Sequence, residues 1–305
     1  MTTITIDQAL QSAKSFNLTA LEGQLLMLHA LGRSTQDRAW LLTHGHETLH
    51  PQTWALFENY AQKRCDHVPL SYLIGQKEFY GLNLQVDPRV LDPRADTETL
   101  VDWALGLLND QASGSSAHQN MHVLDLGTGS GAIALAIKAN TRHCTLWAID
   151  KSQEALEVAK TNALKLGLDL HCVQSHWFEA WKDASQAHEN LNTGGRRGST
   201  LPQLFDLIVS NPPYIAPNDP HLKNLLHEPL NALIAQDEGM SDLRTIVQEA
   251  RNHLNPGAWL ILEHGYDQSA AVRNLMLEWG YFNVQSRSDL AGIERCTGAQ
   301  WPKVK

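Results

Sequence analysis

The segment Ser210-Asn-Pro-Pro-Tyr-Ile215 contains the residues of this sequence best suited to chemistry. Its two successive prolines fix their φ angles and lack backbone N–H donors. The Asn211 side-chain oxygen and the Pro212 carbonyl then form a rigid pair of acceptors, and Tyr214 adds an aromatic face. Such a pair suits a planar NH2 group, which has two N–H bonds to donate. Asn211, Pro212 and Tyr214 are therefore the predicted catalytic residues.

A glycine-rich turn lies upstream, in Val123-Leu-Asp-Leu-Gly-Thr-Gly-Ser-Gly-Ala-Ile133, where a buried strand runs into a helix. Glycines let a backbone turn tightly and approach a ligand closely. The next apolar run ends in Asp150, whose carboxylate can accept hydrogen bonds from two ribose hydroxyls. The spacing G-x-G-x-G differs from the dinucleotide fingerprint G-x-G-x-x-G, and Asp125 suits a cationic amino-acid tail. The loop favours S-adenosylmethionine (SAM) over a dinucleotide or a purely structural turn.

Together the two motifs predict methyl transfer to nitrogen. An amide nitrogen is a poor nucleophile because its lone pair is delocalised, as the rotation barrier of about 18–20 kcal/mol shows. Two acceptors that hold both N–H bonds return electron density to the nitrogen and aim it, and positioning can supply up to ~7–11 kcal/mol. Tyr214 can stack on the substrate and attract the sulfonium. Adenine, guanine, cytosine and glutamine amino groups all fit, and a proline turn without chemistry is the alternative interpretation.

Alternating strands and helices must position these motifs. Short runs rich in Val, Ile and Leu occupy 122–126, 144–149, 170–174, 204–209 and 258–262. Helical patterns occupy 131–140, 152–166, 240–254 and 267–279. This alternation predicts βαβ units in a parallel, doubly wound sheet. Ligands bind beyond the carboxyl ends of such strands, so Asn211 is expected to face the cofactor pocket.

The first 75 residues read as helices, and the hydrophobic pattern around Gly81 predicts a short β-hairpin in 76–91. A helix is expected from Asp96, as its N-cap, to Asn109. Residues 109–120 read as a flexible connection. Residues 183–202 read as a surface loop rather than a site for an anionic partner.

Charge separates the two parts of the 305-residue chain, whose formal net charge is −9. Residues 1–85 have six basic and seven acidic side chains, and the other 18 basic and 26 acidic side chains leave −8 on the remainder. Because basic contacts supply most non-specific affinity for nucleic acid, this balance disfavours a phosphate backbone. It favours a protein loop as substrate, and a basic partner would be attracted.

Composition also predicts the compartment. The chain has no run of the ~18 apolar residues that a membrane span needs. It begins without the basic and apolar regions of a secretory signal. Four cysteines without a C-x-x-C pair indicate reduced thiols in a cytoplasmic protein: Cys65, Cys144, Cys172 and Cys296. No metal site is predicted, because the tightest histidine cluster, His44 to His50, lacks acidic or cysteine partners at zinc-like spacing.

Motifs along the chain match those of one enzyme family. They are Pro69-Leu-Ser-Tyr-Leu-Ile-Gly75, Phe79-Tyr-Gly81, Leu91-Asp-Pro-Arg-Ala-Asp-Thr-Glu98, the glycine loop with Asp125, Asp150, Trp177-Phe178, Asn211-Pro-Pro-Tyr214, Glu228-Pro229, Gly239-Met240, Leu262-Glu-His-Gly265 and Gly292-Ile-Glu-Arg295. Over nearly its whole length the chain resembles the peptide-chain release factor glutamine N5-methyltransferases (HemK/PrmC type). Ala95 stands where that family typically has Pro. His176 stands where it commonly has Asp, and is left out of the predicted site because a protonated His cannot accept from the adenine amine.

The resemblance implies an α/β chain with the Rossmann-like SAM-dependent methyltransferase fold, a seven-stranded, mostly parallel sheet. It implies an N-terminal helical substrate-recognition domain over residues 1–75, a β-hairpin linker over 76–92 and the methyltransferase domain over 93–305. The expected reaction transfers the SAM methyl group to the side-chain nitrogen of the glutamine in the Gly-Gly-Gln motif of class I release factors. S-adenosylhomocysteine is the other product.

Site residues carry over by position. The residues expected to contact SAM are Gly127, Thr128, Gly129, Ser130, Gly131, Asp150, Trp177 and Asn211. Those expected to bind the substrate glutamine are Asn211, Pro212, Pro213 and Tyr214. We expect a monomer without stable nucleic-acid or membrane binding. The alternatives are an amino-methyltransferase acting on adenine or guanine of DNA or RNA, and a non-enzymatic SAM-binding protein.

Overall fold

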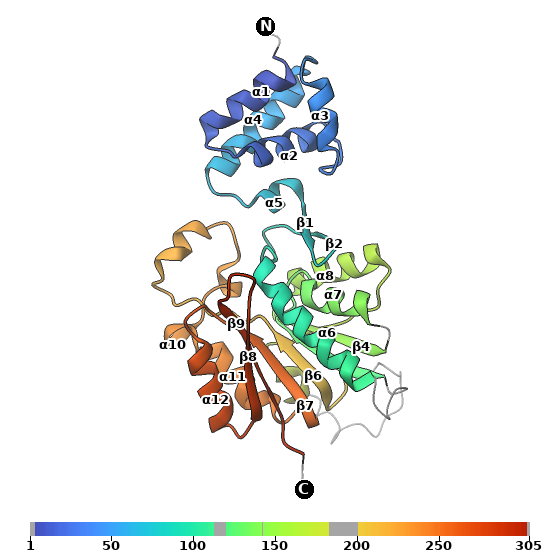
Figure 1. Cartoon of the computed structure of the whole chain (residues 1–305), viewed down its shortest axis with the longest axis vertical. Helices are drawn as coiled ribbons and strands as arrows, with labels where there is room; N and C mark the ends of the chain where they lie inside the picture. The colour runs from blue at the N-terminus through green and yellow to red at the C-terminus, as the bar shows by residue number, and fades with distance from the viewer. Residues whose placement is uncertain (1–3, 113–119, 142, 183–200, 304–305) are drawn as a thin grey trace. The chain divides into compact units, whose positions relative to one another are not determined.

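The computed structural model describes residues 4–112, 120–141, 143–182 and 201–303 (Figure 1). The chain forms two compact units, Met1–Gln76 with Lys223–His227, and Lys77–Leu222 with Glu228–Lys305. Residues 77–92 of the predicted linker belong to the second unit. Most of the predicted loops at 109–120 and 183–202 lies outside the described residues. None of the described helices is long and apolar enough to span a membrane.

The first unit is helical, as predicted. Its helices are α1 (Ile6–Ser12), η1 (Ala13–Phe16), α2 (Ala20–Ala30), α3 (Arg38–His44), α4 (Pro51–Cys65) and α5 (Leu70–Ile74). Thr19 caps α2 in a capping box with Glu22, and Glu22 also pairs with Arg64 of α4 at 2.8 Å. Leu26 of α2 and Phe57 of α4 are fully buried in the core of this unit. The Glu22 side chain thus both helps to cap α2 and joins it to α4.

The second unit contains a seven-stranded, mostly parallel sheet, as expected from the resemblance. Its strands are β3 (Met121–Leu126), β4 (Cys144–Asp150), β5 (His171–Gln174), β6 (Phe205–Ser210), β7 (Leu254–Glu263), β8 (Phe282–Ser288) and β9 (Glu294–Gln300). Their order is β5-β4-β3-β6-β7-β9-β8, and only β9 pairs antiparallel with its neighbours. The chain runs outward from β3 to β5 and then returns to β6 on the other side of β3. This reversal makes a topological switch point between β3 and β6.

Helices cover both faces of this sheet, so it forms the middle of three layers (Figure 1). The helices packed on its faces are α6 (Glu98–Ala112), α7 (Ala132–Asn140), α8 (Gln153–Leu166), α11 (Ser241–Ala250) and α12 (Ser269–Glu278). The short elements in the connections are η2 (Ala95–Thr97), η3 (Pro220–Asn224), η4 (Leu230–Ala232) and α10 (Gln236–Gly239). Leu100 of α6 and Ile133 of α7 belong to one buried cluster. Leu243 of α11 and Val272 of α12 belong to another. The central strands are therefore buried on both faces, which explains their continuous apolar runs.

The predicted hairpin forms as β1 (Gln76–Phe79) and β2 (Leu82–Gln85). Phe79 and Leu84 are buried in the same cluster as α6 and α7. The prediction that Asp96 is the N-cap of the next helix is wrong. Asp96 lies inside the 3-10 turn η2, which continues into α6 at Glu98. Its carboxylate pairs instead with Arg295 at 3.0 Å, so a distant partner holds it rather than the helix N-terminus.

Candidate active site

Two adjacent strands end together at the switch point. Leu126 of β3 and Ser210 of β6 are paired in parallel register. The Ser210 hydroxyl, fully buried, donates to the Leu126 carbonyl at 2.7 Å. The glycine loop leaves β3 at Gly127 and the Asn-Pro-Pro-Tyr segment leaves β6 at Asn211. The two motifs that the sequence suggested for cofactor and chemistry therefore start side by side.

The glycine loop has backbone angles that favour glycine, with φ of +73° at Gly127 and +83° at Gly131. Asp125 organises the loop from below. Its buried carboxylate accepts hydrogen bonds from the Thr128 hydroxyl at 2.7 Å and the Ala134 N–H at 3.3 Å. Burial raises the pKa of Asp125 to about 7. Asp125 does not line the pocket described below, so the expectation that it faces a cationic tail is not supported.

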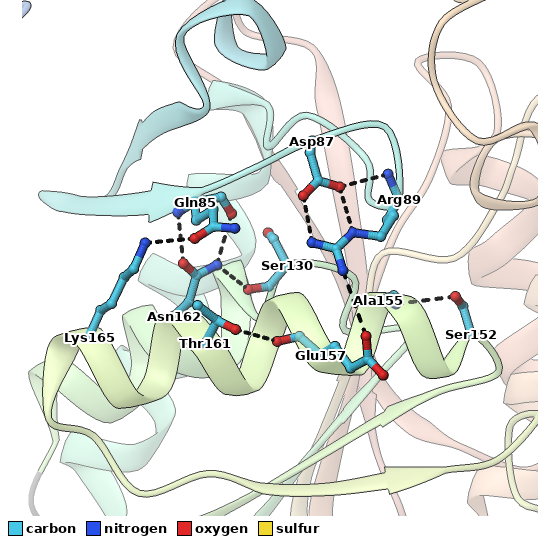
Figure 2. A network of polar contacts seen from close by, with 10 residues as sticks. All are labelled: Gln85, Asp87, Arg89, Ser130, Ser152, Ala155, Glu157, Thr161, Asn162 and Lys165. Carbon is cyan, nitrogen blue, oxygen red and sulfur yellow. Dashed lines mark hydrogen bonds and ion pairs between the residues drawn. The ribbon is translucent and has the colours of Figure 1, made fainter. Parts of the chain in front are cut away.

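Asn162 of α8 fixes the far side of the loop. Figure 2 shows its side chain between Gln85, at the end of β2, and Ser130. The amide accepts from the Gln85 N–H at 2.7 Å and donates to the carbonyls of Gln85 at 3.0 Å and Ser130 at 2.9 Å. All the polar groups of this fully buried side chain are thus satisfied, and one residue ties the hairpin, the loop and α8 together.

Asp150 ends β4 beside the same loop. Its Oδ2 accepts from the Gly129 N–H and its Oδ1 from the Ser152 N–H, each at 2.9 Å. Burial raises the pKa of Asp150 and these backbone donors oppose that shift. A carboxylate has about four acceptor positions, so Asp150 keeps acceptor capacity beyond its backbone bonds.

Trp177 forms a wall opposite the glycines. Its φ is +47°, and its indole N–H donates to Asp242 at 3.2 Å. A Cβ added at Gly127 would lie 3.5 Å from the Trp177 ring, so the glycine backbone and the ring are in contact distance. The buried indole therefore lies in contact with the start of the loop.

These groups line one pocket beyond the carboxyl ends of β3, β4 and β6, which is where α/β sheets of this kind bind ligands. Of the predicted site residues, six line it: Gly127, Gly129, Asp150, Trp177, Asn211 and Pro213. The other five are not among the lining residues: Thr128, Ser130, Gly131, Pro212 and Tyr214. The predicted roles of all these residues remain predictions.

The pocket also has walls that were not among the predicted site residues. They are Arg89, Val90, Leu91, Lys151, Ser152, Ala155, Ser175, His176, Pro229, Asn231 and Ala232. Lys151, Ser152 and Ser175 directly follow β4 and β5, so the strand-end rule could have found them. His176 lines the pocket although it was left out, and it lies 3.6 Å from Glu179. Leu91 and Pro229 belong to stretches that carried the family resemblance, whereas Arg89, Val90, Asn231 and Ala232 gave no local signal.

Asn211 and Tyr214 are held from behind. The Asn211 Nδ2 donates to the Thr97 hydroxyl at 3.3 Å, and the Tyr214 hydroxyl donates to Glu263 at 3.4 Å. The Tyr214 carbonyl accepts from the Gln268 side chain at 3.1 Å. Burial raises the pKa of Tyr214, so its hydroxyl stays protonated as a donor.

Nearby, Arg94 forms an ion pair with the buried Glu228. Arg94 belongs to the stretch Leu91 to Glu98 and Glu228 to the stretch Glu228-Pro229, both of which carried the family resemblance. Among the described residues, no group of three His, Cys, Asp or Glu side chains is placed to hold a metal ion.

Comparisons with known proteins match both parts of the chain. A family model described as the PrmC N-terminal domain matches residues 6–75, and one described as a methyltransferase domain matches residues 117–297. A release factor glutamine methyltransferase from Xylella fastidiosa (strain Temecula1) is 41% identical over 298 residues, 96% of this chain and 98% of its own. The chain belongs to the release factor glutamine methyltransferase family.

A second relative of that name, from Burkholderia pseudomallei (strain K96243), is 41% identical over 293 residues and 93% of each chain. A solved protein-(glutamine-N5) methyltransferase (release factor-specific) from Alicyclobacillus acidocaldarius aligns with 72% of this chain and 99% of its own, at 24% identity and a TM-score of 0.39. The sequence relatives carry the assignment. The predicted family and enzyme class, a SAM-dependent methyltransferase, are confirmed.

Proposed function

We propose that this enzyme transfers the methyl group of SAM to the side-chain nitrogen of the glutamine in the Gly-Gly-Gln motif of class I release factors. The observation that carries this proposal is the position of Asn211. It follows β6 at the switch point, lines the same pocket as Gly127 and Asp150, and presents an amide to that pocket. The full-length similarity to release factor glutamine methyltransferases supports the substrate.

The pocket residues fit SAM. Asp150 keeps acceptor capacity for a ribose hydroxyl beyond its backbone bonds. Gly129 lines the pocket, and a Cβ there would meet nothing within 4 Å, so glycine leaves this space to a ligand. Trp177 and Asn211 complete the walls, while Thr128, Ser130 and Gly131 shape the loop. When bound, SAM supplies an electrophilic methyl group on a positively charged sulfur.

Asn211 and Pro212 prepare the nucleophile. The Asn211 oxygen and the Pro212 carbonyl accept hydrogen bonds from the two N–H groups of the substrate amide. These hydrogen bonds return electron density to the amide nitrogen and direct its lone pair at the methyl carbon. Pro213 and Tyr214 shape the site for the flat amide group. The nitrogen becomes acidic only as the methyl group arrives, and its proton then leaves to water. A strong general base is not required.

The rest of the chain supports a protein substrate. Residues 86–305 carry a formal charge of −8, which attracts a basic partner rather than a phosphate backbone. We assign substrate recognition to the helical first unit. We also propose that the enzyme acts in the cytoplasm as a monomer, without a metal and without stable binding to nucleic acid or membranes.

Methyl incorporation from labelled SAM tests the function. We expect incorporation into a class I release factor, and none into DNA or ribosomes at the same concentration. Asn211→Ala is expected to keep SAM affinity within about threefold and to lose turnover by at least ~10²-fold. Asn252→Ala, an exposed asparagine of the same unit, is the matched control and keeps full activity. Preferential incorporation into DNA or ribosomes, or an active Asn211→Ala enzyme, would overturn the proposal.

A further inference from the structure

Two buried polar residues lie directly behind the Asn-Pro-Pro-Tyr segment and are outside the pocket. Thr97, in the turn η2, is 4% exposed, and Glu263, at the end of β7, is 1% exposed. Both belong to stretches that carried the family resemblance, and the mechanism above does not use either. A buried hydroxyl and a buried carboxylate must satisfy their hydrogen bonds inside the protein, so their partners are informative.

Their partners are the two ends of the Asn-Pro-Pro-Tyr segment. The Tyr214 hydroxyl donates to Glu263 Oε1 at 3.4 Å, and the Asn211 Nδ2 donates to Thr97 Oγ1 at 3.3 Å. The Thr97 hydroxyl also hydrogen-bonds to the Glu263 carboxyl and lowers its pKa. Glu263 therefore connects directly to Tyr214 and, through Thr97, to Asn211.

The direction of these bonds follows from proton counting. A threonine hydroxyl has one proton to donate and two lone pairs that accept. Glu263 Oε1 accepts from Tyr214, and any proton on the carboxyl is left to the unpartnered Oε2, so the Thr97 proton points to Glu263. Thr97 can then only accept from Asn211, and must receive the NH2 end of that amide. The oxygen end of the Asn211 amide is thereby turned away from Thr97.

We propose that Thr97 and Glu263 are positioning residues that fix the orientation of the Asn211 side-chain amide, so that its oxygen, and not its NH2 group, meets the substrate. This inference rests on the proposed function. The opposite orientation would set the Asn211 NH2 against the NH2 of the substrate, donor against donor, and would remove the acceptor that activates the nitrogen. An amide alone cannot make this choice, because its two ends have nearly the same shape.

The charges around Glu263 fit this role. Burial raises the pKa of Glu263 to about 7, and the nearby Asp96 raises it too, while Thr97, Tyr214 and Arg295 lower it. Its second oxygen, Oε2, has no partner among the described residues, so the hydrogen bonds at Oε1 carry its contacts to the segment. Near neutral pH the carboxyl is therefore partly protonated, and the unpartnered Oε2 can hold that proton while Oε1 accepts from Tyr214 and Thr97.

Paired variants at Thr97 test the proposal, with turnover measured on a release factor. Thr97→Val has nearly the same shape but no hydroxyl, and is expected to lower kcat at least ~10-fold while the SAM dissociation constant stays within about twofold. Thr97→Ser keeps the hydroxyl and should restore most of kcat. Thr161→Val, in which the lost hydroxyl bonds to a helix carbonyl, is the matched control and should keep full activity. A folded Thr97→Val enzyme with wild-type kcat would overturn the proposal.

Glu263→Gln provides a second, independent test because it introduces an NH2 donor that can reverse the order of the bonds. We expect Glu263→Gln to lower kcat. Adding Thr97→Val to the Glu263→Gln variant should then lower kcat by less than about a further twofold. Multiplicative losses in the double variant would show that the two residues act separately and would contradict the proposal. If Glu263→Gln does not fold, the Thr97 pair decides alone. If instead the wild-type enzyme fails to methylate any release factor, that result contradicts the proposed function and not the positioning role of Thr97 and Glu263.

Discussion

Gly239 lies against the backbone of Tyr214, and alanine at this position is expected to displace the Asn-Pro-Pro-Tyr segment. The glycine has φ +86°. A Cβ added there would lie 2.7 Å from Gln268 Nε2 and 2.8 Å from the Tyr214 carbonyl carbon, and closer still to the Tyr214 carbonyl oxygen. Cβ atoms essentially never come within 3.0 Å of other heavy atoms, so the Tyr214 backbone must move.

Gly280 offers a matched control. It has the same φ of +86°, but a Cβ there would meet nothing within 4 Å. Gly280→Ala therefore measures the cost of alanine in a left-handed conformation, about 1–2 kcal/mol. Gly239→Ala should show this cost and, in addition, the consequence of moving Tyr214. Because a 1 Å misplacement in a site can cost ~10²-fold in rate, we expect a 10- to 100-fold lower kcat for Gly239→Ala alone.

The assay combines thermal unfolding with turnover on a release factor. Both variants should unfold at a lower temperature than the wild type, and both should bind SAM within about threefold of the wild-type affinity. Only Gly239→Ala should lose kcat. If Gly239→Ala keeps kcat within about twofold of Gly280→Ala, the contact between Gly239 and Tyr214 does not position the reacting groups, and the reasoning is refuted.

Three further predictions concern the glycine loop. Asp150→Ala removes a charged acceptor and should weaken SAM binding by at least ~10²-fold in calorimetry, whereas the exposed Asp169→Ala should not; equal affinities would exclude Asp150 as a cofactor ligand. Asn162→Ala removes the side-chain partner of three backbone groups, the buried Ser130 carbonyl and the part-buried N–H and carbonyl of Gln85, and should lower the free energy of unfolding by roughly 3 kcal/mol. Denaturant titration measures this, and a loss below ~1 kcal/mol would contradict the clamp. The pKa of Asp125 is raised from 3.8 to about 7 in the folded protein. Between pH 4 and pH 7 the folded state therefore keeps a proton on Asp125 that the unfolded chain has released. The contribution of Asp125 to stability therefore falls as pH rises from 4 to 7, and Asp125→Asn should remove that part of the pH dependence; an unchanged slope would refute the raised pKa.

The sequence predicted the parts of the fold that are buried and regular. The central strands are covered on both faces, so their apolar runs and the glycine turn after β3 stand out. From the residues alone β8 and β9 were missed, because β8 is mostly exposed at the edge of the sheet and its residues, Phe282–Ser288, are largely polar. The resemblance to a known family supplied the seven-stranded sheet instead.

The candidate site was predicted where a strand end or a motif marks it. Asp150 and Asn211 line the pocket because Asp150 ends β4 and Asn211 follows β6, at the same edge of the sheet. Arg89 and Asn231 line it from segments that are far away in the sequence, and only the fold brings them there. Asp96 shows the same limit, since its N-cap pattern was local while its partner, Arg295, lies 199 positions later.

The most direct test of the proposed activity is to locate the transferred methyl group. A class I release factor is incubated with the enzyme and methyl-labelled SAM, digested, and sequenced by tandem mass spectrometry. We predict one added methyl group, on the side-chain nitrogen of the glutamine in the Gly-Gly-Gln motif, and no label in a release factor in which that glutamine is replaced. Label at another residue, or undiminished label in the replaced protein, would contradict the account.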